Sequence, residues 1–134
     1  MDEIQQLVAT NEIRNLVAQY AQYTDDTRLE EWTGLFVEDA RMEASGQPLE
    51  WRPALTEWIT CVTSSMKLRH IMGGHTVTLD SATEAHGAAD MILLAAVEGN
   101  WVLAGAPRYV DKYMKTDAGW RFAERILEDR PAKA

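Results

Sequence analysis

The sequence predicts an α+β fold, with N-terminal helices packed on a curved, mostly antiparallel sheet. Apolar residues over 13–24 recur at steps of three and four, which is the period of one buried helical face. From 67 to 128 the apolar residues alternate instead, and short turn sequences interrupt them, as in an antiparallel meander. A run of helices followed by a run of strands is typical of α+β domains. We expect the helices to cover one face of the sheet and to enclose a pocket.

Length, charge and cysteine content narrow the class of protein. A chain of 134 residues predicts a single domain, 1–134, that can bury about two thirds of its unfolded surface without disulfides or metals. The net charge of −8 and the pI near 4.8 disfavour nucleic-acid and anionic-membrane partners, because both would repel an acidic surface. The single cysteine, Cys61, fits a reducing compartment, and no signal-like or membrane-spanning apolar run is present. We therefore expect a cytoplasmic protein.

The N-terminal segment predicts two helices in succession. Residues 2–9 favour a short leading helix, and Thr10 or Asn11 can cap the main helix that follows. The inward face of the main helix consists of residues that recur at steps of three and four, namely Ile13, Leu16, Val17, Tyr20 and Thr24.

A further helical segment is expected over 29–36. Thr27 and Glu30 match a capping box at its start, in which each side chain bonds the other residue's backbone N–H. Asp26 could cap this segment equally well. These two caps give Asp26 and Thr27 structural roles.

Two short strands and another helix come next. Residues 40–44 and 47–50 flank Ser45-Gly46, a turn pair, and so predict a hairpin. Pro53 suits the first turn of the helix that follows. Its apolar stripe, which ends near Met66, consists of Leu55, Trp58, Ile59 and Val62.

The first long strand, 67–79, contains a slip in its alternation. His70 and Met72 share one parity, whereas Val77 and Leu79 share the other. A bulge at Gly73-Gly74 would add one residue between them. The bulge predicts one inner face made of His70, Met72, His75, Val77 and Leu79.

Three more strands complete the predicted sheet. The strand 85–97 has an unbroken small-to-apolar face, and its other face ends in Ile92 and Leu94, which suggest a subunit interface or ordinary surface residues. The strand 101–116 contains Pro107, which indicates an edge or a bulge. The last strand, 120–128, places Trp120, Phe122 and Ile126 on one face, and residues 130–134 form a tail.

Two polar residues of the main helix stand out. Tyr20 lies on its inward face, and Asp25 follows where the amphipathic pattern stops, so a carboxylate reaches the mouth of the predicted pocket. Each has a plainer explanation, because Asp is common in solvated turns and Tyr is common in cores. The residues alone do not decide between these alternatives.

The order of elements and several short segments resemble the SnoaL-like branch of the nuclear transport factor 2-like superfamily, a cone-shaped fold shared by scytalone dehydratase and ketosteroid isomerase. The resemblance spans nearly the whole chain. It is carried by Ile13-Arg14-Asn15-Leu16, Tyr20-Ala21, Asp25, Leu35-Phe36-Val37-Glu38-Asp39-Ala40, Arg69-His70, Tyr109-Val110-Asp111 and Gly119-Trp120-Arg121-Phe122-Ala123-Glu124-Arg125. These segments are more specific for the fold than for a reaction, because the fold hosts several enzyme classes and non-catalytic subunits.

The resemblance implies an active site. Asp25 and His70 match the catalytic Asp–His dyad of scytalone dehydratase, hexachlorocyclohexane dehydrochlorinase and bile-acid dehydratase. Tyr20 matches a tyrosine of the bile-acid enzyme, and Arg125 matches a last-strand arginine that reaches those pockets. The alternation of the last strand disagrees, since it places Arg125 on the face opposite Phe122.

Two positions depart from relatives of this fold. The base of ketosteroid isomerase is replaced by Ala44, which argues against that mechanism. The asparagine that often follows the histidine by four residues is Gly74.

The resemblance therefore implies a cofactor-independent lyase, of the dehydratase or dehydrohalogenase type, or an isomerase that acts on a hydrophobic cyclic small molecule. His70 would be the general base, and Tyr20 would hold or protonate a leaving hydroxyl or an enolate oxygen. The expected pocket walls are Trp32, Trp58, Met72 and Met91. We also expect a homo-oligomer, either dimer or trimer.

Several alternatives stay open. The protein could be a non-catalytic ligand-binding or accessory subunit, and His70 could be an ordinary core histidine. His75 would substitute for His70 if the bulge were misplaced, whereas His86 is expected to face outward. The three histidines lack the spacing of a zinc site, so no metal is predicted.

Overall fold

The structure is a computed structural model that describes residues 1–133. It has three helices, α1 (Glu3–Asp25), α2 (Leu29–Thr33) and α3 (Trp51–Ser65). The strands are β1 (Phe36–Ala44), β2 (Gln47–Glu50), β3 (Leu68–Leu79), β4 (Glu84–Val97), β5 (Asn100–Gly105), β6 (Arg108–Thr116) and β7 (Gly119–Glu128). The predicted α+β class is confirmed. Residue 134, the end of the predicted tail, lies outside the described residues.

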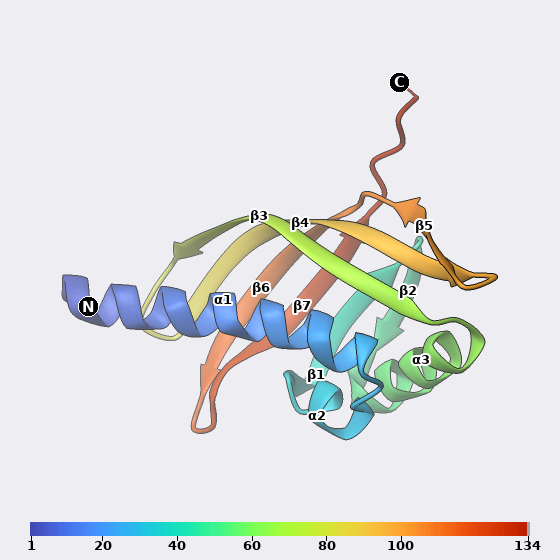
Figure 1. The fold of residues 1–134 in the computed structure, drawn as a ribbon. Coiled ribbons are helices and arrows are strands. Elements are labelled where there is room, and N and C mark those ends of the chain that lie inside the picture. Colours follow the sequence, from blue (N-terminus) through green and yellow to red (C-terminus); the bar gives the residue numbers. More distant parts are fainter. Residues whose placement is uncertain (134) are drawn as a thin grey trace.

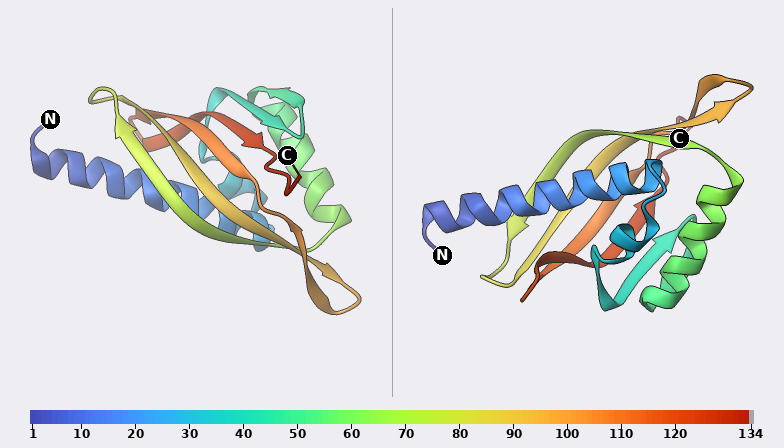
Figure 2. Two further views of the ribbon diagram at one scale, coloured as in Figure 1. Left: turned by 90° about the horizontal axis from the view of Figure 1, so that it is seen from above. Right: turned by 60° about the horizontal axis from the view of Figure 1, so that its bottom comes forward.

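All seven strands belong to one curved sheet with the order β2-β1-β7-β6-β4-β3, and β5 pairs with β4 beside this path. The β1–β7 pair is parallel, and the other pairs are antiparallel. Helix α1 runs along the concave side of the sheet, and α3 lies near the C-terminal end of α1, next to β1 and β2 (Figures 1 and 2). The helices and the sheet thus face one another across the interior. No helix among the described residues is both long and apolar enough to cross a membrane.

Helix α1 is continuous, so the expected break near Thr10 is wrong. Asp2 caps the helix instead, because its carboxylate accepts the Gln5 N–H at 2.7 Å and the Gln5 side chain accepts the Asp2 N–H at 2.9 Å. This capping box satisfies the first turn, and Thr10 then lies within the helix. The predicted inward face is buried, from Ile13 to Thr24.

The predicted capping box at Thr27 is also wrong. Arg28 occupies the N-cap of α2 without a side-chain bond, and Thr27 adopts φ 53° with its hydroxyl donated to the Asp26 carbonyl. The left-handed residue makes a tight connection from α1 to α2. Helix α2 ends at Thr33, and Phe36 already belongs to β1.

The bulge in β3 is confirmed. Met72 pairs with Met91 and His75 pairs with Ala89, so Gly73 and Gly74 together oppose one residue of β4. His70, Met72, His75, Val77 and Leu79 are partly buried on one face, as predicted, and their neighbours are exposed.

The strand expected over 101–116 is divided in two. Its first half, β5, pairs with residues 93–97 of β4, and its second half, β6, pairs with residues 84–90. Pro107 lies at the break, where it has no N–H to donate but its carbonyl accepts the Met91 N–H at 3.2 Å. Proline therefore ends one ladder and the next begins beyond it.

Strand β7 contains an irregularity that was not predicted. Tyr113 pairs with Phe122 but Lys112 pairs with Glu124, so one residue is added and the alternation reverses. Beyond that point Arg125 is buried, whereas Ile126 is only partly buried. The expectation that Ile126 shares the inner face with Phe122 is corrected accordingly.

Candidate active site

Asp25 and His70 meet at one end of the interior. Asp25 is the last residue of α1, and His70 lies on the inner face of β3. One Asp25 oxygen lies 2.6 Å from Nδ1 of His70, and the other accepts the His70 backbone N–H at 2.9 Å. The side chains are 14% and 6% exposed, respectively, so the pair is largely shielded from water.

This contact determines the tautomer of His70. A carboxylate can only accept, so Nδ1 carries the proton and donates it to Asp25. The lone pair of Nε2 is then free to accept a proton. The hydrogen bond from the His70 backbone N–H to the same carboxylate also holds Asp25 beside the imidazole ring.

His70 lines a cavity of about 470 Å³, a volume within the usual range of small-molecule sites. Tyr20 and Tyr109 line the cavity with His70, and the rest of the wall is mainly apolar. The apolar part includes Trp58, Ile59, Val62, Met91, Leu93 and Leu127.

Two of the four residues expected in the pocket wall line this cavity, namely Trp58 and Met91. Trp32 is fully buried one layer behind, with its ring 5.5 Å from that of Tyr20 and 6.3 Å from that of Trp58. Met72 packs against the core from β3 and borders a different hollow. Neither Trp32 nor Met72 is among the residues that line the cavity.

Tyr20 is 2% exposed and lies among aromatic rings, including that of Tyr109 at 5.5 Å and that of His70 at 6.4 Å. Burial raises the pKa of Tyr20 to about 12, because an ionised phenol would lose its hydration. Tyr20 is therefore a neutral hydrogen-bond donor at neutral pH.

Arg125 does not line the cavity but lies behind Tyr20 and Tyr109. Its guanidinium carbon is 4.3 Å from the centre of the Tyr20 ring and 3.7 Å from that of Tyr109. Two of its nitrogens bond both oxygens of Asp111, at 2.8 and 3.1 Å, and both side chains are fully buried. Burial opposes the charge of Arg125, but the Asp111 carboxylate outweighs it and raises the pKa of the guanidinium. The resemblance thus indicated the side of β7 that Arg125 occupies, and the alternation did not.

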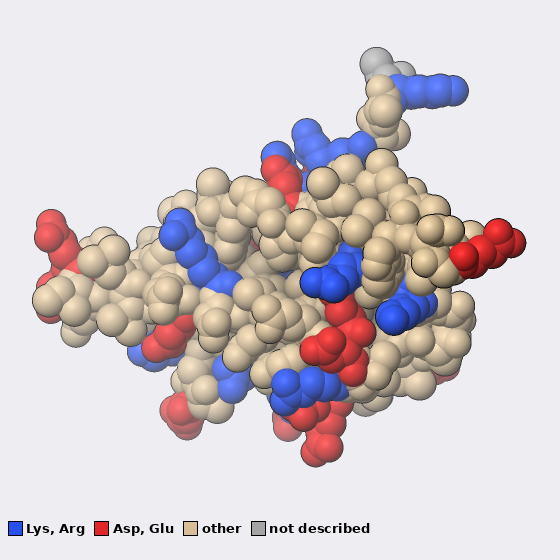
Figure 3. Space-filling view, in the orientation of Figure 1, with Lys and Arg blue, Asp and Glu red and all other residues tan. Residues whose placement is uncertain are grey.

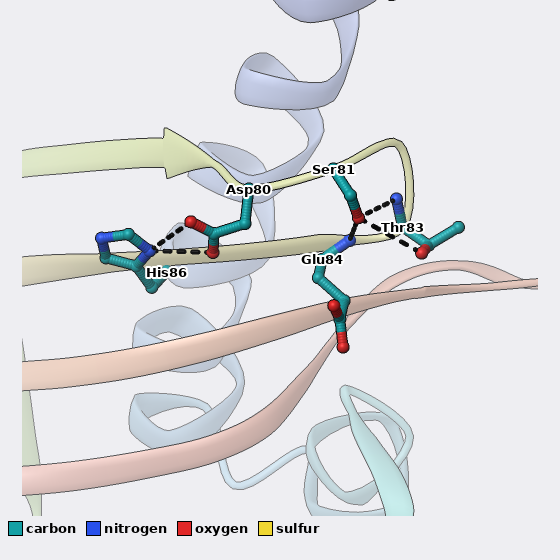
Figure 4. Close-up of polar contacts among 5 residues, drawn as sticks. All are labelled: Asp80, Ser81, Thr83, Glu84 and His86. Atoms are coloured by element: carbon teal, nitrogen blue, oxygen red, sulfur yellow. Dashed lines mark hydrogen bonds and ion pairs between the residues drawn. The ribbon is translucent and has the colours of Figure 1, made fainter.

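The other two histidines lie outside this cavity. Nε2 of His75 is 3.1 Å from the Tyr113 hydroxyl, which donates to Asp111 at 2.8 Å. His86 is exposed, and Nδ1 pairs with Asp80 beside the β3–β4 turn (Figure 4). His86 therefore faces outward as expected. His70 and His75 share the inner face of β3, and it is His70, nearer the start of the strand, that meets Asp25.

Sequence reasoning did not assign roles to Tyr109 and Asp111. Both belong to the Tyr109-Val110-Asp111 segment, and its alternation puts them on one face of β6. The alternation therefore indicated that both residues face inward. It could not show that Asp111 is an ion-pair partner, because alternation does not identify the cation that a buried carboxylate contacts.

The chain belongs to the family of SnoaL-like domains, whose model matches residues 5–126. No curated protein matches the chain in sequence. This assignment agrees with the resemblance seen in the sequence and with the α+β architecture.

Solved structures share the fold. A variant of Rv3472 from Mycobacterium tuberculosis, a protein of unknown function, has a TM-score of 0.92 at 26% identity, over 99% of this chain and 79% of its own. An NTF2-like protein with a cystatin-like fold from Novosphingobium aromaticivorans has a TM-score of 0.86 at 23% identity, over 98% and 88%. A type 2 hexachlorocyclohexane dehydrochlorinase has a TM-score of 0.86 at 19% identity, over 97% and 90%. The fold is thus shared with a dehydrochlorinase and with a protein of unknown function.

Proposed function

We propose that this protein is a cofactor-independent lyase, of the dehydratase or dehydrohalogenase type, or an isomerase that acts on a hydrophobic cyclic small molecule. The observation that carries the proposal is the Asp25–His70 contact at 2.6 Å beside a cavity that Tyr20 also lines. A histidine whose tautomer is fixed by a carboxylate is a common general base.

In this proposal Nε2 of His70 takes a proton from a carbon next to a carbonyl or another activating group. The C–H electron pair then forms a double bond while a hydroxide or halide leaves from the adjacent carbon. Asp25 stabilises the imidazolium that results. Return of the proton to a different carbon, without loss of a group, would be an isomerisation.

Tyr20 donates a hydrogen bond to the oxygen that becomes negative, or to the leaving hydroxyl. Its raised pKa supports this role, because the phenol keeps its proton at neutral pH. Arg125 acts on Tyr20 from behind and is a positioning residue, since it is fully buried and has no access to the cavity. Trp58 and Met91 contact the rings of the substrate.

The test is a screen of small cyclic hydroxy-ketones, halides and epoxides with the wild-type chain, followed by His70→Ala and Asp25→Asn on the active compound. We expect each substitution to lower kcat by roughly 10²–10⁴-fold, as for other general bases. The control is His86→Ala, which removes an exposed histidine outside the cavity and should leave kcat unchanged.

The tautomer gives a second measurement that needs no substrate. Nitrogen-15 NMR of the wild-type chain should report His70 protonated at Nδ1, and Asp25→Asn should lose that preference. A fall in kcat without any change in the tautomer would contradict the role of Asp25. Turnover that persists in His70→Ala would contradict the enzyme proposal and favour a ligand-binding or accessory subunit.

We also propose that the protein acts as a homo-oligomer. Ile71 and Ile92 are cross-strand partners on the outer face of the sheet, and they are 45% and 47% exposed. Adjacent exposed apolar residues favour association of subunits.

A further inference from the structure

The cavity offers almost no charge to a ligand. Among the residues described as lining it, none is Asp, Glu, Lys or Arg, and its ionisable side chains are Tyr20, His70 and Tyr109. Burial raises the pKa of both tyrosines, so both phenols are neutral at neutral pH. We call the part of the cavity beside Tyr20 and His70 its inner end. A charged ligand group there would lose its hydration without gaining a counter-ion.

The charges behind the cavity wall do not favour an anion either. Arg125 is fully buried, and its charge is neutralised by the two-point contact with Asp111. The carboxylate of Asp25 lies behind His70 and has no cation paired with it while the imidazole is neutral. The inner end therefore has hydrogen-bonding groups but, among the described residues, no free cation to pair with a negative group.

A second polar end lies at the β1–β2 turn. Ser45 and Gln47 line the cavity there, and both are exposed. Ser45 and Gly46 have φ values of 51° and 77°, as a two-residue hairpin turn of type I′ requires, so the turn presents Gln47 from a fixed backbone. No described hydrogen bond uses the Gln47 side chain, which leaves its amide free to bond a ligand.

We propose that the cavity takes an uncharged ring compound with a hydroxyl or carbonyl group at each end. One group lies between Tyr20 and His70, and the other bonds Gln47, which selects ligands that carry this second group. This inference rests on the proposed function in one respect, namely that the reaction takes place at the inner end, beside Tyr20 and His70. A carboxylate or phosphate is excluded from that inner end because it would find no counter-ion among the residues described there.

Three naphthalenes test the proposal by isothermal titration calorimetry, and none has a leaving group, so binding is separate from turnover. 2,6-Dihydroxynaphthalene has a hydroxyl at each end, 2-naphthol has one, and naphthalene-2,6-dicarboxylate must place a carboxylate inside. We expect the diol to bind at least roughly 10²-fold more tightly than the dicarboxylate, because an unpaired buried charge is costly.

The role of Gln47 is tested with Gln47→Leu. It should weaken binding of the diol by roughly 3- to 10-fold, as expected for one neutral hydrogen bond, and leave 2-naphthol unchanged. The matched control is Gln22→Leu on the exposed side of α1, outside the cavity, which should change neither affinity.

Three outcomes would overturn the proposal. In the first, the dicarboxylate binds as tightly as the diol. In the second, Gln47→Leu weakens binding of the diol and of 2-naphthol equally. In the third, neither neutral probe binds at millimolar concentration. If the expected affinities are found but no compound is turned over, the ligand class holds and the proposed reaction fails.

Discussion

Arg125–Asp111 and Arg108–Asp90 are ion pairs with the same two-point geometry but different exposure. The first pair is fully buried, whereas the side chains of the second are 37% and 47% exposed. We predict that Asp111→Asn lowers the free energy of unfolding by about 3–5 kcal/mol, because it leaves the Arg125 charge buried without a partner. Asp90→Asn should change it little, since water screens an exposed pair.

Urea unfolding followed by circular dichroism measures both variants. Equal losses of stability in Asp111→Asn and Asp90→Asn would show that burial does not govern these pairs. Arg125→Met in the Asp111→Asn background provides a further check, because removing the unpaired charge should restore part of the lost stability.

His75 gives the protein a pH-dependent contribution to stability. Burial lowers the pKa of His75 below its ordinary value, and this effect outweighs the opposing attraction of the Asp111 carboxylate. The unfolded chain therefore binds a proton near pH 6.5 that the folded chain binds only at lower pH. Because the unfolded state binds more protons in this window, the free energy of unfolding must decrease as the pH falls.

We predict that wild-type protein loses more stability than His75→Gln between about pH 7.5 and about pH 5.5. The measurement is urea unfolding of both chains at the two pH values, and the quantity compared is the difference between the two losses. Other titrating groups are common to both chains and cancel. Equal losses would mean that His75 has the same pKa in the folded and unfolded states.

At the scale of elements, two bulges show what alternation can predict. The β3 bulge was predictable because apolar residues lie on both sides of Gly73-Gly74 and their parity changes between them. The β7 irregularity was not, because the residue it turns inward is Arg125, and a buried charge looks like an outward residue in a hydrophobic pattern. Only the family resemblance indicated that Arg125 points inward.

The candidate site shows the same division. The positions of Tyr20 and Asp25 along α1 follow from helical periodicity, and that of His70 follows from the bulge. Their proximity does not follow, since the two halves of the dyad are 45 residues apart and meet through tertiary packing. Likewise, Trp32 and Trp58 were both predicted wall residues, but only the packing of α2 and α3 decides that Trp58 faces the cavity.

Close approach of β3 and β4 requires a glycine at position 87. A Cβ atom there would lie 2.2 Å from the Thr76 carbonyl oxygen and 3.3 Å from the Tyr113 ring, whereas one on Gly74 would meet no atom within 4 Å. We predict that Gly87→Ala destabilises the protein by about 1–3 kcal/mol, because the backbone of β3 must move. Gly74→Ala, in the bulge, should be nearly neutral.

Thermal and urea unfolding compare these two glycine variants with wild type. The prediction fails if Gly74→Ala is the more destabilising change. That result would mean that the bulge needs glycine for its conformation, although neither Gly73 nor Gly74 has a positive φ.

At the scale of the whole molecule, charge and apolar surface are unevenly distributed. On the face seen in Figure 3, charged side chains gather around α2 and the C-terminal end of α1. Exposed apolar residues lie elsewhere, on the outer face of the sheet at Ile71 and Ile92 and near the start of α1 at Leu7. A net charge of −8 disfavours random association, so stable self-association requires a specific contact surface.

We predict that the outer face of the sheet supplies this surface. Light scattering after size-exclusion chromatography should give wild type a mass of two or three times 15.1 kDa. Ile92→Glu should give the monomer mass, because a buried carboxylate without a partner opposes association. Leu7→Glu is the matched control, since Leu7 is 70% exposed on α1, and it should keep the wild-type mass. If Leu7→Glu instead dissociates the protein and Ile92→Glu does not, subunits associate through the start of α1, and the outer face of the sheet is free.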